Sequence, residues 1–252
     1  METKLKDKVA IVTGASKGIG AGIAKALGLG GATVVVNYAS GESDANKVVS
    51  EIQAGGGKAI AIQADMSKSA DIKRMFDQTK LELGSIDILV NNAGVAVFEM
   101  VADLTEEAFH QQFNLNVLGY LLATQQAVKH MGDNGGSIIN ISSILSTDPY
   151  LASSVYAATK GAVDTITLAL ARELGPKKIR VNAILPGHTN TPATAGNFDG
   201  EFGEKLLAGT PLGRFGEPED IAPLAVFLAS DDAHWITGES IRASGGVRGV
   251  GY

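Results

Sequence analysis

Short runs of apolar, mostly β-branched residues alternate with longer segments of helical character along nearly the whole chain. The run Ile86-Asp-Ile-Leu-Val90 is almost continuously apolar, as a strand that is buried on both faces requires. Parallel strands need crossover connections, and helical segments fill the gaps between the runs. The pattern predicts an α/β protein in which a doubly wound, seven-stranded parallel sheet is the middle of three layers. The strands are expected at residues 9–13, 33–37, 59–63, 86–90, 137–141, 179–184 and 240–243.

Length and composition favour a single domain. The chain has 252 residues, of which 45% are hydrophobic, and α/β folds of this size commonly share one core. We therefore expect one domain over residues 1–252. One stretch, at about residues 188–217, is rich in glycine and turns, and we interpret it as an insert that covers the substrate.

Charge and residue usage exclude several classes of function. The chain has 27 acidic and 21 basic residues and a net charge of -6, which argues against nucleic acid or an anionic membrane as a partner. It has no cysteine, so a disulfide framework and a thiolate nucleophile are excluded. The histidines at positions 110, 130, 188 and 234 lack the spacing of metal ligands. A charged first segment and the lack of a long apolar stretch predict a soluble, cytoplasmic protein.

A cluster of glycines follows the first expected strand. Gly14, Gly18 and Gly20 stand between that strand and an alanine-rich helical segment at residues 21–29. Glycine lets the backbone turn tightly and approach a phosphate closely, and the free N–H groups at a helix start can bind a pyrophosphate. The spacing Gly-x3-Gly-x-Gly differs from the Gly-x-Gly-x-x-Gly fingerprint. An ordinary turn is the alternative, although the position after the first strand favours a nucleotide site.

Tyr156 and Lys160 lie four residues apart in a long helix-forming segment, which puts a phenol and an ammonium on one helical face. A free tyrosine has a pKa of about 10, and a nearby cation favours the phenolate and lowers that pKa. The pair therefore has the composition of a general acid. The alternative is a surface tyrosine beside a solvated lysine, so the interpretation needs support from other residues.

Further motifs follow other expected strands. Asn91-Asn-Ala-Gly94 follows the fourth, Ser142 and Ser143 follow the fifth, and Pro186-Gly187 follows the sixth. In an open parallel sheet the carboxyl ends of the strands meet at one edge, where ligands bind. We expect these motifs to lie together with the glycine cluster.

Taken together, these motifs carry a family resemblance: the chain resembles the short-chain dehydrogenase/reductases of about its own length. The resemblance covers almost the whole chain and implies a Rossmann-like fold and hydride transfer between a nicotinamide and a carbonyl or an alcohol. It rests on Thr13-Gly-Ala-Ser-Lys-Gly-Ile-Gly20, Asn91-Asn-Ala-Gly94, Asn116, Ser143, Tyr156-x-x-x-Lys160, Pro186-Gly187 and Ile236-Thr-Gly238, in the family's order and spacing.

The resemblance implies four catalytic residues. Tyr156 would protonate the carbonyl oxygen during reduction and remove the alcohol proton during oxidation. Ser143 would hold the same oxygen, although it could instead cap the following turn. Lys160 would lower the pKa of Tyr156 and bind the nicotinamide ribose. Asn116 would bend its helix and hold a water that links Lys160 to solvent; the alternative is a solvent-facing residue, and Asn114 lies close by in the sequence.

The residues after the second strand bear on the choice between NADP and NAD. Enzymes that use NAD place an acid about 20 residues past the glycine motif, where it binds the ribose 2′-OH. This chain has Asn37-Tyr-Ala-Ser40 there, its first acid is Glu42 in the next helical segment, and Lys17 lies in the glycine turn, as in members that prefer NADP. We expect NADP(H), with NAD(H) as the alternative.

The resemblance also distributes the cofactor contacts. Asp65 and Met66 would flank the adenine, residues 92–94 would lie under its ribose, and Thr189 and Thr191 would hold the carboxamide. The expected cofactor-binding residues are Gly14, Ser16, Lys17, Gly18, Ile19, Gly20, Asn37, Tyr38, Ala39, Ser40, Asp65, Met66, Asn92, Ala93, Gly94, Tyr156, Lys160, Pro186, Gly187, Thr189 and Thr191.

The substrate is less constrained by the sequence. A mostly apolar pocket would suit a small-molecule ketone or aldehyde with an alkyl or aryl group. Core packing explains any one of its expected residues equally well. The alternatives are a 3-oxoacyl group on an acyl carrier protein, a sugar such as glucose, and a non-catalytic nucleotide-binding scaffold. The expected pocket residues are Leu145, Tyr150, His188, Phe202 and Leu206.

Two features concern assembly. The helical segment at residues 154–174 is apolar on more than one side, which indicates burial against another subunit, and family members suggest a homotetramer or a homodimer. The chain departs from the family's pattern at Arg242-Ala-Ser-Gly-Gly246, where relatives usually have an acid before the glycine pair. The tail beyond it is expected to bring Tyr252 to a partner's insert.

Overall fold

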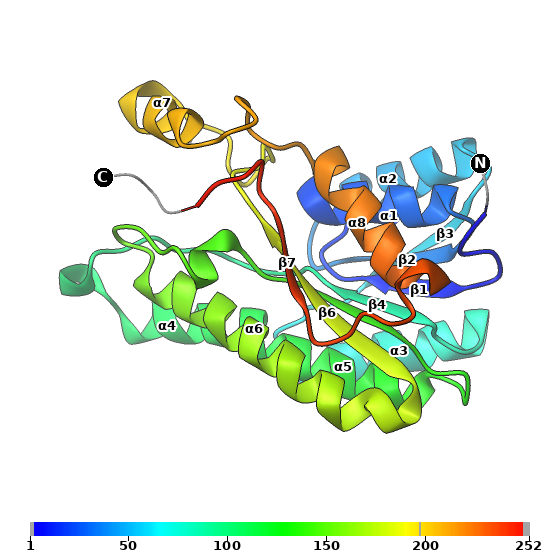
Figure 1. The fold of residues 1–252 in the computed structure, drawn as a ribbon. Coiled ribbons are helices and arrows are strands. Elements are labelled where there is room, and N and C mark those ends of the chain that lie inside the picture. Colours follow the sequence, from blue (N-terminus) through cyan, green and yellow to red (C-terminus); the bar gives the residue numbers. More distant parts are fainter. Residues whose placement is uncertain (1–2, 197, 249–252) are drawn as a thin grey trace.

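The computed structural model describes residues 3–196 and 198–248. These residues form a single parallel sheet with helices on both faces (Figure 1). The strand order is β3-β2-β1-β4-β5-β6-β7, so the predicted doubly wound, seven-stranded sheet is confirmed. The strands are β1 (Val9–Val12), β2 (Thr33–Tyr38), β3 (Lys58–Gln63), β4 (Ile88–Asn91), β5 (Gly136–Ile141), β6 (Ile179–Pro186) and β7 (Ser240–Ala243).

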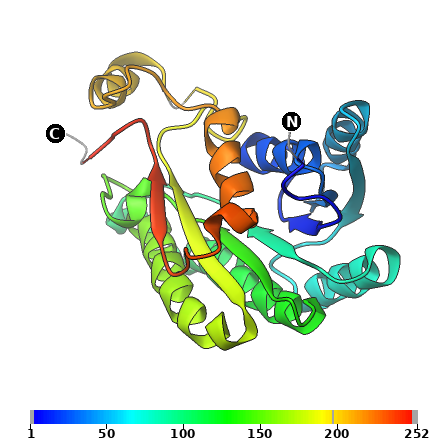
Figure 2. The same cartoon turned by 45° about the vertical axis from the view of Figure 1, so that its right-hand side comes forward.

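The helices complete the outer two layers. One face is covered by α1 (Gly18–Leu29), α2 (Glu42–Ala54) and α8 (Pro218–Ala229), and the other by α3 (Ser69–Leu83), α4 (Glu106–Phe113), α5 (Gly119–His130) and α6 (Ser154–Leu174). A further helix, α7 (Gly200–Ala208), stands apart from both layers, on the side of the molecule where the described chain ends (Figure 2). No helix in the described part of the chain is long and apolar enough to cross a membrane.

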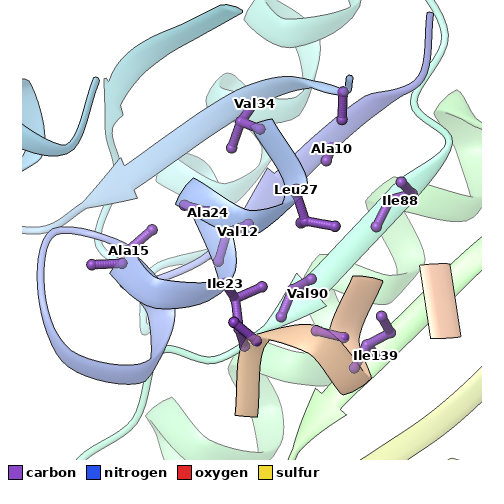
Figure 3. Close-up of a cluster of buried hydrophobic side chains, with 14 of the residues drawn as sticks. Ala10, Val12, Ala15, Ile23, Ala24, Leu27, Val34, Ile88, Val90 and Ile139 are labelled. Carbon is purple, nitrogen blue, oxygen red and sulfur yellow. The ribbon is translucent and has the colours of Figure 1, made fainter. Parts of the chain in front are cut away.

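Apolar side chains alternate between the two faces of the sheet. On β1, Ala10 and Val12 pack toward α1, whereas Ile11 packs toward the opposite helices. Figure 3 shows the first of these clusters, in which Ile23 and Leu27 of α1 meet the strands. A side chain points to alternate faces along a strand, so one strand contributes to two cores. The sheet is therefore buried on both sides, as its apolar sequence runs predict.

The observed strands differ slightly from the predicted ones. The fourth begins at Ile88 instead of residue 86, because Ile86 makes an isolated bridge to Met131 and does not join the ladder. The sixth extends to Pro186, which pairs with Ala243 at the end of β7. The predicted insert contains α7 as well as turns, and a parallel bridge between Thr189 and Gly216 joins its two ends.

Candidate active site

The glycine turn between β1 and α1 is held by the loop that follows β4. Thr13 Oγ1 accepts hydrogen bonds from the N–H groups of Asn92 (2.9 Å) and Ala93 (3.0 Å), and the Asn92 amide donates to the carbonyl oxygens of Thr13 (2.9 Å) and Gly14 (3.0 Å). Gly14 has a φ of 61°, and a Cβ there would lie 2.9 Å from Ala93 Cα. A Cβ on Gly20 would lie 2.4 Å from Asn92 Nδ2. Both positions therefore require glycine.

This turn has the geometry of a dinucleotide-phosphate site. It lies at the carboxyl edge of the sheet and leads directly into α1, whose first N–H groups have no partners within the helix. Lys17 is exposed at the start of α1, and Ser40 is exposed after β2. The sequence motif thus folds into the strand, glycine turn and helix that a pyrophosphate needs.

Asn37 and Asn92 fix this turn with their side chains. Asn37 is buried at the end of β2, where its Oδ1 accepts from the N–H of Gly14 (3.0 Å) and its Nδ2 donates to the carbonyl oxygens of Ile62 (3.3 Å) and Ala64 (3.1 Å). The amide of Asn92 is likewise used by carbonyl groups of the turn. These two side chains therefore position the loops that would bind the cofactor, and their direct contacts with the cofactor stay a prediction.

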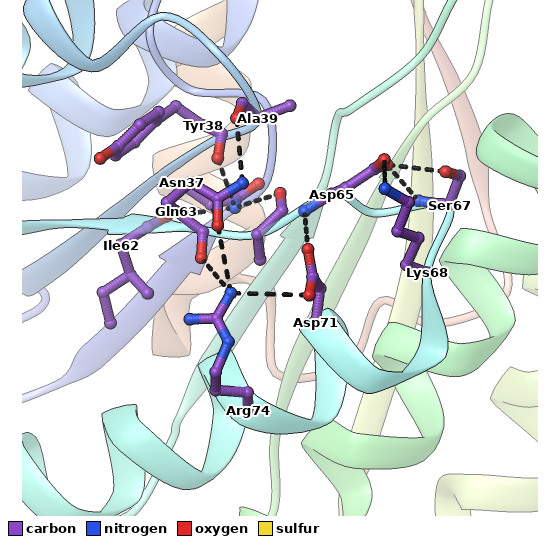
Figure 4. A network of polar contacts seen from close by, with 11 residues as sticks. Asn37, Tyr38, Ala39, Ile62, Gln63, Asp65, Ser67, Lys68, Asp71 and Arg74 are labelled. Carbon is purple, nitrogen blue, oxygen red and sulfur yellow. Dashed lines mark hydrogen bonds and ion pairs between the residues drawn. The ribbon is translucent and has the colours of Figure 1, made fainter.

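A polar network fixes the ends of β2 and β3 (Figure 4). The Arg74 guanidinium donates to the Gln63 carbonyl oxygen (2.8 Å) and to its side-chain oxygen (3.1 Å), and the Gln63 amide donates to the Ala39 carbonyl oxygen (3.0 Å). Asp65 accepts from the N–H and the hydroxyl of Ser67, and these bonds lower the pKa of Asp65 below its ordinary value. The network holds the loop that is expected to flank the adenine.

The structure brings Ser143, Tyr156 and Lys160 together at the same edge of the sheet. Tyr156 and Lys160 lie one turn apart on α6, and the Lys160 ammonium is 5.6 Å from the centre of the Tyr156 ring. Ser143 follows β5, and its hydroxyl lies close enough to the Tyr156 phenol to favour a lower pKa of that phenol. Ser143 Oγ accepts from the N–H of Leu145 at 3.2 Å, so the capping interpretation is confirmed, and the catalytic role of Ser143 stays a prediction.

Burial acts on Tyr156 and Lys160 in opposite directions. It raises the pKa of Tyr156 to about 12 and lowers the pKa of Lys160 to about 8, because apolar surroundings favour the neutral form of each group. The expectation that Lys160 brings the pKa of Tyr156 below its ordinary value is therefore wrong for this structure. The Lys160 ammonium donates to the Ile141 carbonyl oxygen at 2.8 Å. Burial of the Tyr156 phenol raises its pKa by more than the nearby Ser143 hydroxyl lowers it.

Asn116 is buried where the helical chain between α4 and α5 widens into a π-turn, at Asn114–Leu118. The helix is thus irregular at Asn116, where a bend was predicted, and the alternative of a solvent-facing residue is excluded. Its amide donates to the Val95 carbonyl oxygen (2.8 Å) and to Thr159 Oγ1 (3.1 Å), and its Oδ1 accepts from the N–H of Val95 (2.9 Å). Asn116 therefore ties the loop after β4 to α6, while a bridging water stays a prediction.

The expected nicotinamide contacts lie after β6. Gly187 packs so closely on Ser244 that a Cβ would meet its Cα at 2.7 Å. Thr189 is buried, and its hydroxyl donates to the Gly187 carbonyl oxygen at 3.0 Å. Thr191 lies next to the glycine turn, because a Cβ on Gly18 would be 3.3 Å from the Thr191 Cβ. The segment thus lies at the same edge as the turn, although the carboxamide contact itself stays a prediction.

The aromatic residues among the predicted substrate residues make two separate sets of ring contacts. Tyr150 and Phe202 are in edge-to-face contact, with ring centres 6.0 Å apart. His188 packs instead against Phe198 and Phe215, and burial lowers its pKa, so it is neutral at physiological pH. Leu145 and Leu206 are both buried.

Sequence reasoning missed Phe98. Its ring centre lies 5.7 Å from that of Tyr156 and 6.1 Å from that of Tyr150. The residue belongs to the loop that follows β4, only four positions beyond Gly94 of the Asn91-Asn-Ala-Gly94 motif. That proximity to a recognised motif was the one signal in the sequence that could have found it.

A family model described as Enoyl-(Acyl carrier protein) reductase matches residues 14–248. An uncharacterised oxidoreductase of Methylorubrum extorquens is 54% identical over 248 residues, which cover 98% of this chain and 100% of the relative. The chain belongs to the short-chain dehydrogenase/reductase family. Another relative of this dehydrogenase/reductase, versicolorin reductase of Emericella nidulans, is 40% identical over 255 residues, or 97% of each chain.

Solved structures share the fold of this short-chain dehydrogenase/reductase. A blue fluorescent protein from a metagenomic library, in complex with NADPH, is 37% identical with a TM-score of 0.91 over 97% of this chain and 99% of the other. A short-chain dehydrogenase from Burkholderia cenocepacia, in complex with NADP, is 36% identical with the same TM-score and coverage. The Rossmann-like fold expected from the motifs is thereby confirmed. The predicted role of Tyr252 lies outside the described residues.

Proposed function

We propose that this short-chain dehydrogenase/reductase reduces a ketone or aldehyde to an alcohol with NADP(H), reversibly, and that Tyr156 is its general acid and base. One observation carries the proposal: the partly buried Tyr156 phenol lies beside Ser143 and one helical turn from the buried Lys160, at the sheet edge that holds the glycine turn. A non-catalytic scaffold has no need for a buried ammonium beside a phenol.

The protein groups have distinct tasks in the reducing direction. NADPH, when bound, supplies the hydride that reaches the carbonyl carbon. Tyr156 keeps its proton at neutral pH, since burial raises its pKa to about 12, and it gives that proton to the carbonyl oxygen. The Ser143 hydroxyl donates to the same oxygen as negative charge develops. Lys160 stabilises the resulting phenolate by its positive charge until the proton is replaced.

Several observations support NADP(H) over NAD(H). The structures similar to this chain include one with NADPH and one with NADP. The end of β2 has no acid to bind a ribose 2′-OH, and Lys17 is exposed in the glycine turn. Glu42 and Asp44 stand in the first turn of α2, where they oppose a 2′-phosphate. We expect a preference for NADPH, which the negative charges of these two acids make smaller.

The test is a panel of substrates followed by the absorbance of NADPH. Free ketones and aldehydes should be reduced, and a 3-oxoacyl thioester and glucose should react poorly if at all. Tyr156→Phe should bind NADPH with unchanged affinity and lose at least about 10²-fold in kcat, the usual scale of a proton-transfer contribution. Tight NADPH binding without turnover across the panel would instead support a nucleotide-binding scaffold.

We also propose that the chain is a single domain that assembles as a homotetramer or a homodimer. All seven strands belong to one sheet that forms the middle layer, which supports the single domain. Leu118 directly before α5, Leu121 of α5 and Leu168 of α6 are exposed, which supports burial against another copy. Light scattering on the purified protein should give the mass of two or four chains, and a monomer at micromolar concentration would contradict this.

A further inference from the structure

Aromatic rings extend outward from the catalytic phenol in an unbroken series. Phe98 is tilted against the Tyr156 ring at 5.7 Å, Tyr150 is stacked on Phe98 at 6.1 Å, and Phe202 meets the edge of Tyr150 at 6.0 Å. These distances join ring centres, and each lies within the range of an attractive aromatic pair. We call Phe98, Tyr150 and Phe202 the aromatic row. Its members come from three segments: the loop after β4, the loop before α6, and α7.

The aromatic row is exposed where the protein core would bury such side chains. Phe98 is 43% exposed and Phe202 is 50% exposed, whereas Phe76 in the core is fully buried. Single exposed apolar residues are common and need no explanation, but a contiguous set that begins at the catalytic group is typical of a ligand site. Ring surface is therefore available next to the phenol that gives the proton.

The inner part of the aromatic row is held firmly. The N–H of Val97 donates to Gln112 Oε1 (3.2 Å), and the N–H of Glu99 donates to the Ala152 carbonyl oxygen (2.9 Å), so the backbone on both sides of Phe98 is fixed. The N–H of Tyr150 donates to Ser153 Oγ (3.1 Å). Because Phe98 and Tyr150 are fixed in advance, a ligand ring that packs on them loses little free energy to ordering.

The nature of the surface selects among carbonyl compounds. A sugar needs several hydrogen-bonding partners, whereas the aromatic row offers ring faces and edges and one phenol. An alkyl chain gains only from the burial of apolar area, whereas an aryl ring also gains from offset or edge-to-face contacts with the rings. The geometry therefore favours an aromatic ring attached directly to the reacting carbonyl, since the row begins beside Tyr156.

We infer that the substrate is an aryl ketone whose ring packs on Phe98 and Tyr150 while its carbonyl oxygen meets Tyr156 and Ser143, and that Phe98 determines the preference for an aromatic ring. The inference rests on the proposed function, because it presupposes carbonyl reduction at this site. Phe202, on a helix of the insert, covers the outer side of the ring.

The experiment compares two ketones of similar shape, acetophenone and cyclohexyl methyl ketone, as substrates with NADPH. The wild-type protein should favour acetophenone in kcat/KM by about tenfold, which is about 1.4 kcal/mol at 1.36 kcal/mol per factor of ten. Phe98→Leu keeps an apolar side chain but removes the ring, so it should abolish this preference and leave the saturated ketone within about threefold. Phe202→Leu should reduce the preference less, because Phe202 lies at the outer end of the row.

Phe109→Leu is the matched control, because Phe109 is also partly exposed but packs against Phe113 on α4, outside the aromatic row. It should leave the preference unchanged. Melting temperatures of the variants show whether each is folded, and a misfolded Phe98→Leu is replaced by Phe98→Met. Equal kcat/KM for both ketones in the wild type, or an equal loss for both in the folded Phe98 variant, overturns the aryl assignment while carbonyl reduction stands. If neither ketone nor any other carbonyl compound is reduced, both proposals fail.

Discussion

Lys160 and Asp164 lie one turn apart on α6, and the charge of each favours ionisation of the other. Burial opposes both: it lowers the pKa of Lys160 to about 8 and raises the pKa of Asp164. The nearby hydroxyl groups of Ser146 and Ser142 and the charge of Arg242 also favour the Asp164 carboxylate. The Lys160 ammonium, on which the proposed mechanism depends, therefore has a pKa only slightly above physiological pH. Asp164, one turn along α6, is the charged group that raises this pKa.

The first prediction concerns the pH dependence of reduction. Lys160 must be charged to stabilise the Tyr156 phenolate, so kcat/KM should fall as the pH rises through about 8. Asp164→Asn removes a charge that favours the ammonium and should move this midpoint to lower pH. Asp103→Asn, at an exposed position, is the control and should leave it in place. If Asp164→Asn has the wild-type pH profile, the fall in kcat/KM above about pH 8 cannot be assigned to Lys160.

The second prediction concerns the free energy of unfolding. The pKa of Lys160 is about 8 in the folded protein and 10.5 ordinarily, so between these values the unfolded chain binds more protons and stability rises with pH. Between about pH 7.5 and about pH 9.5, the contribution of Lys160 to the free energy of unfolding should increase by roughly 2 kcal/mol. Urea unfolding of the wild type and of Lys160→Met at both pH values measures it. Parallel changes in the two proteins would contradict the prediction.

The third prediction separates Asn116 from Asn114. Asn116→Ala leaves the N–H and the carbonyl oxygen of Val95 without their partner, so the free energy of unfolding should fall by roughly 2–4 kcal/mol. Asn114→Ala, at an exposed position nearby, should change it by less than about 0.5 kcal/mol. Chemical denaturation measures both variants. Similar losses from the two substitutions would show that the contacts of Asn116 do not stabilise the loop.

The fourth prediction concerns cofactor choice. Lys17 is exposed in the glycine turn, whose Gly14 and Ala15 bond to Asn37 of β2, and it is the basic residue expected to approach the 2′-phosphate of NADPH. Lys17→Ala should lower kcat/KM for NADPH by about tenfold and leave the value for NADH nearly unchanged. Lys47→Ala, on α2, is a control of equal charge change. An equal loss of kcat/KM with NADPH and NADH would mean that Lys17 does not determine the preference for the 2′-phosphate.

The fifth prediction concerns Arg242, which begins the segment where the sequence departs from its family's pattern. Its guanidinium donates to the Asp148 carboxylate (2.6 Å) and to the Thr147 hydroxyl, so it ties β7 to the loop that carries Tyr150. Arg242→Met should raise KM for the ketone several-fold. It should leave KM for NADPH unchanged, because the loop that carries Tyr150 is expected to contact the substrate and not the cofactor. Arg248→Ala is the control. An unchanged KM for the ketone would remove Arg242 from substrate positioning.

The sequence predicted the order of strands and helices, the glycine turn and the pairing of Tyr156 with Lys160. Each of these depends on neighbours in the chain: alternation of apolar runs, glycine at fixed spacing, and residues one helical turn apart. The predicted helix at residues 154–174 matches α6 in the structure. The position of the site followed from the rule that carboxyl ends of parallel strands meet at one edge.

Tertiary structure decided the rest. Phe98 joins the site because the loop after β4 bonds to Gln112 and Ala152, which are remote in sequence, and no local pattern encodes that contact. The side chains of Asn37 and Asn92 turn toward backbone groups of the glycine turn, so their role depends on which strands are neighbours. The pKa of Tyr156 rises instead of falling, because it depends on how completely the assembled chain removes water from the phenol. The sequence determines which groups share a helix face; their burial, and hence their charge, arises only when separate segments pack together.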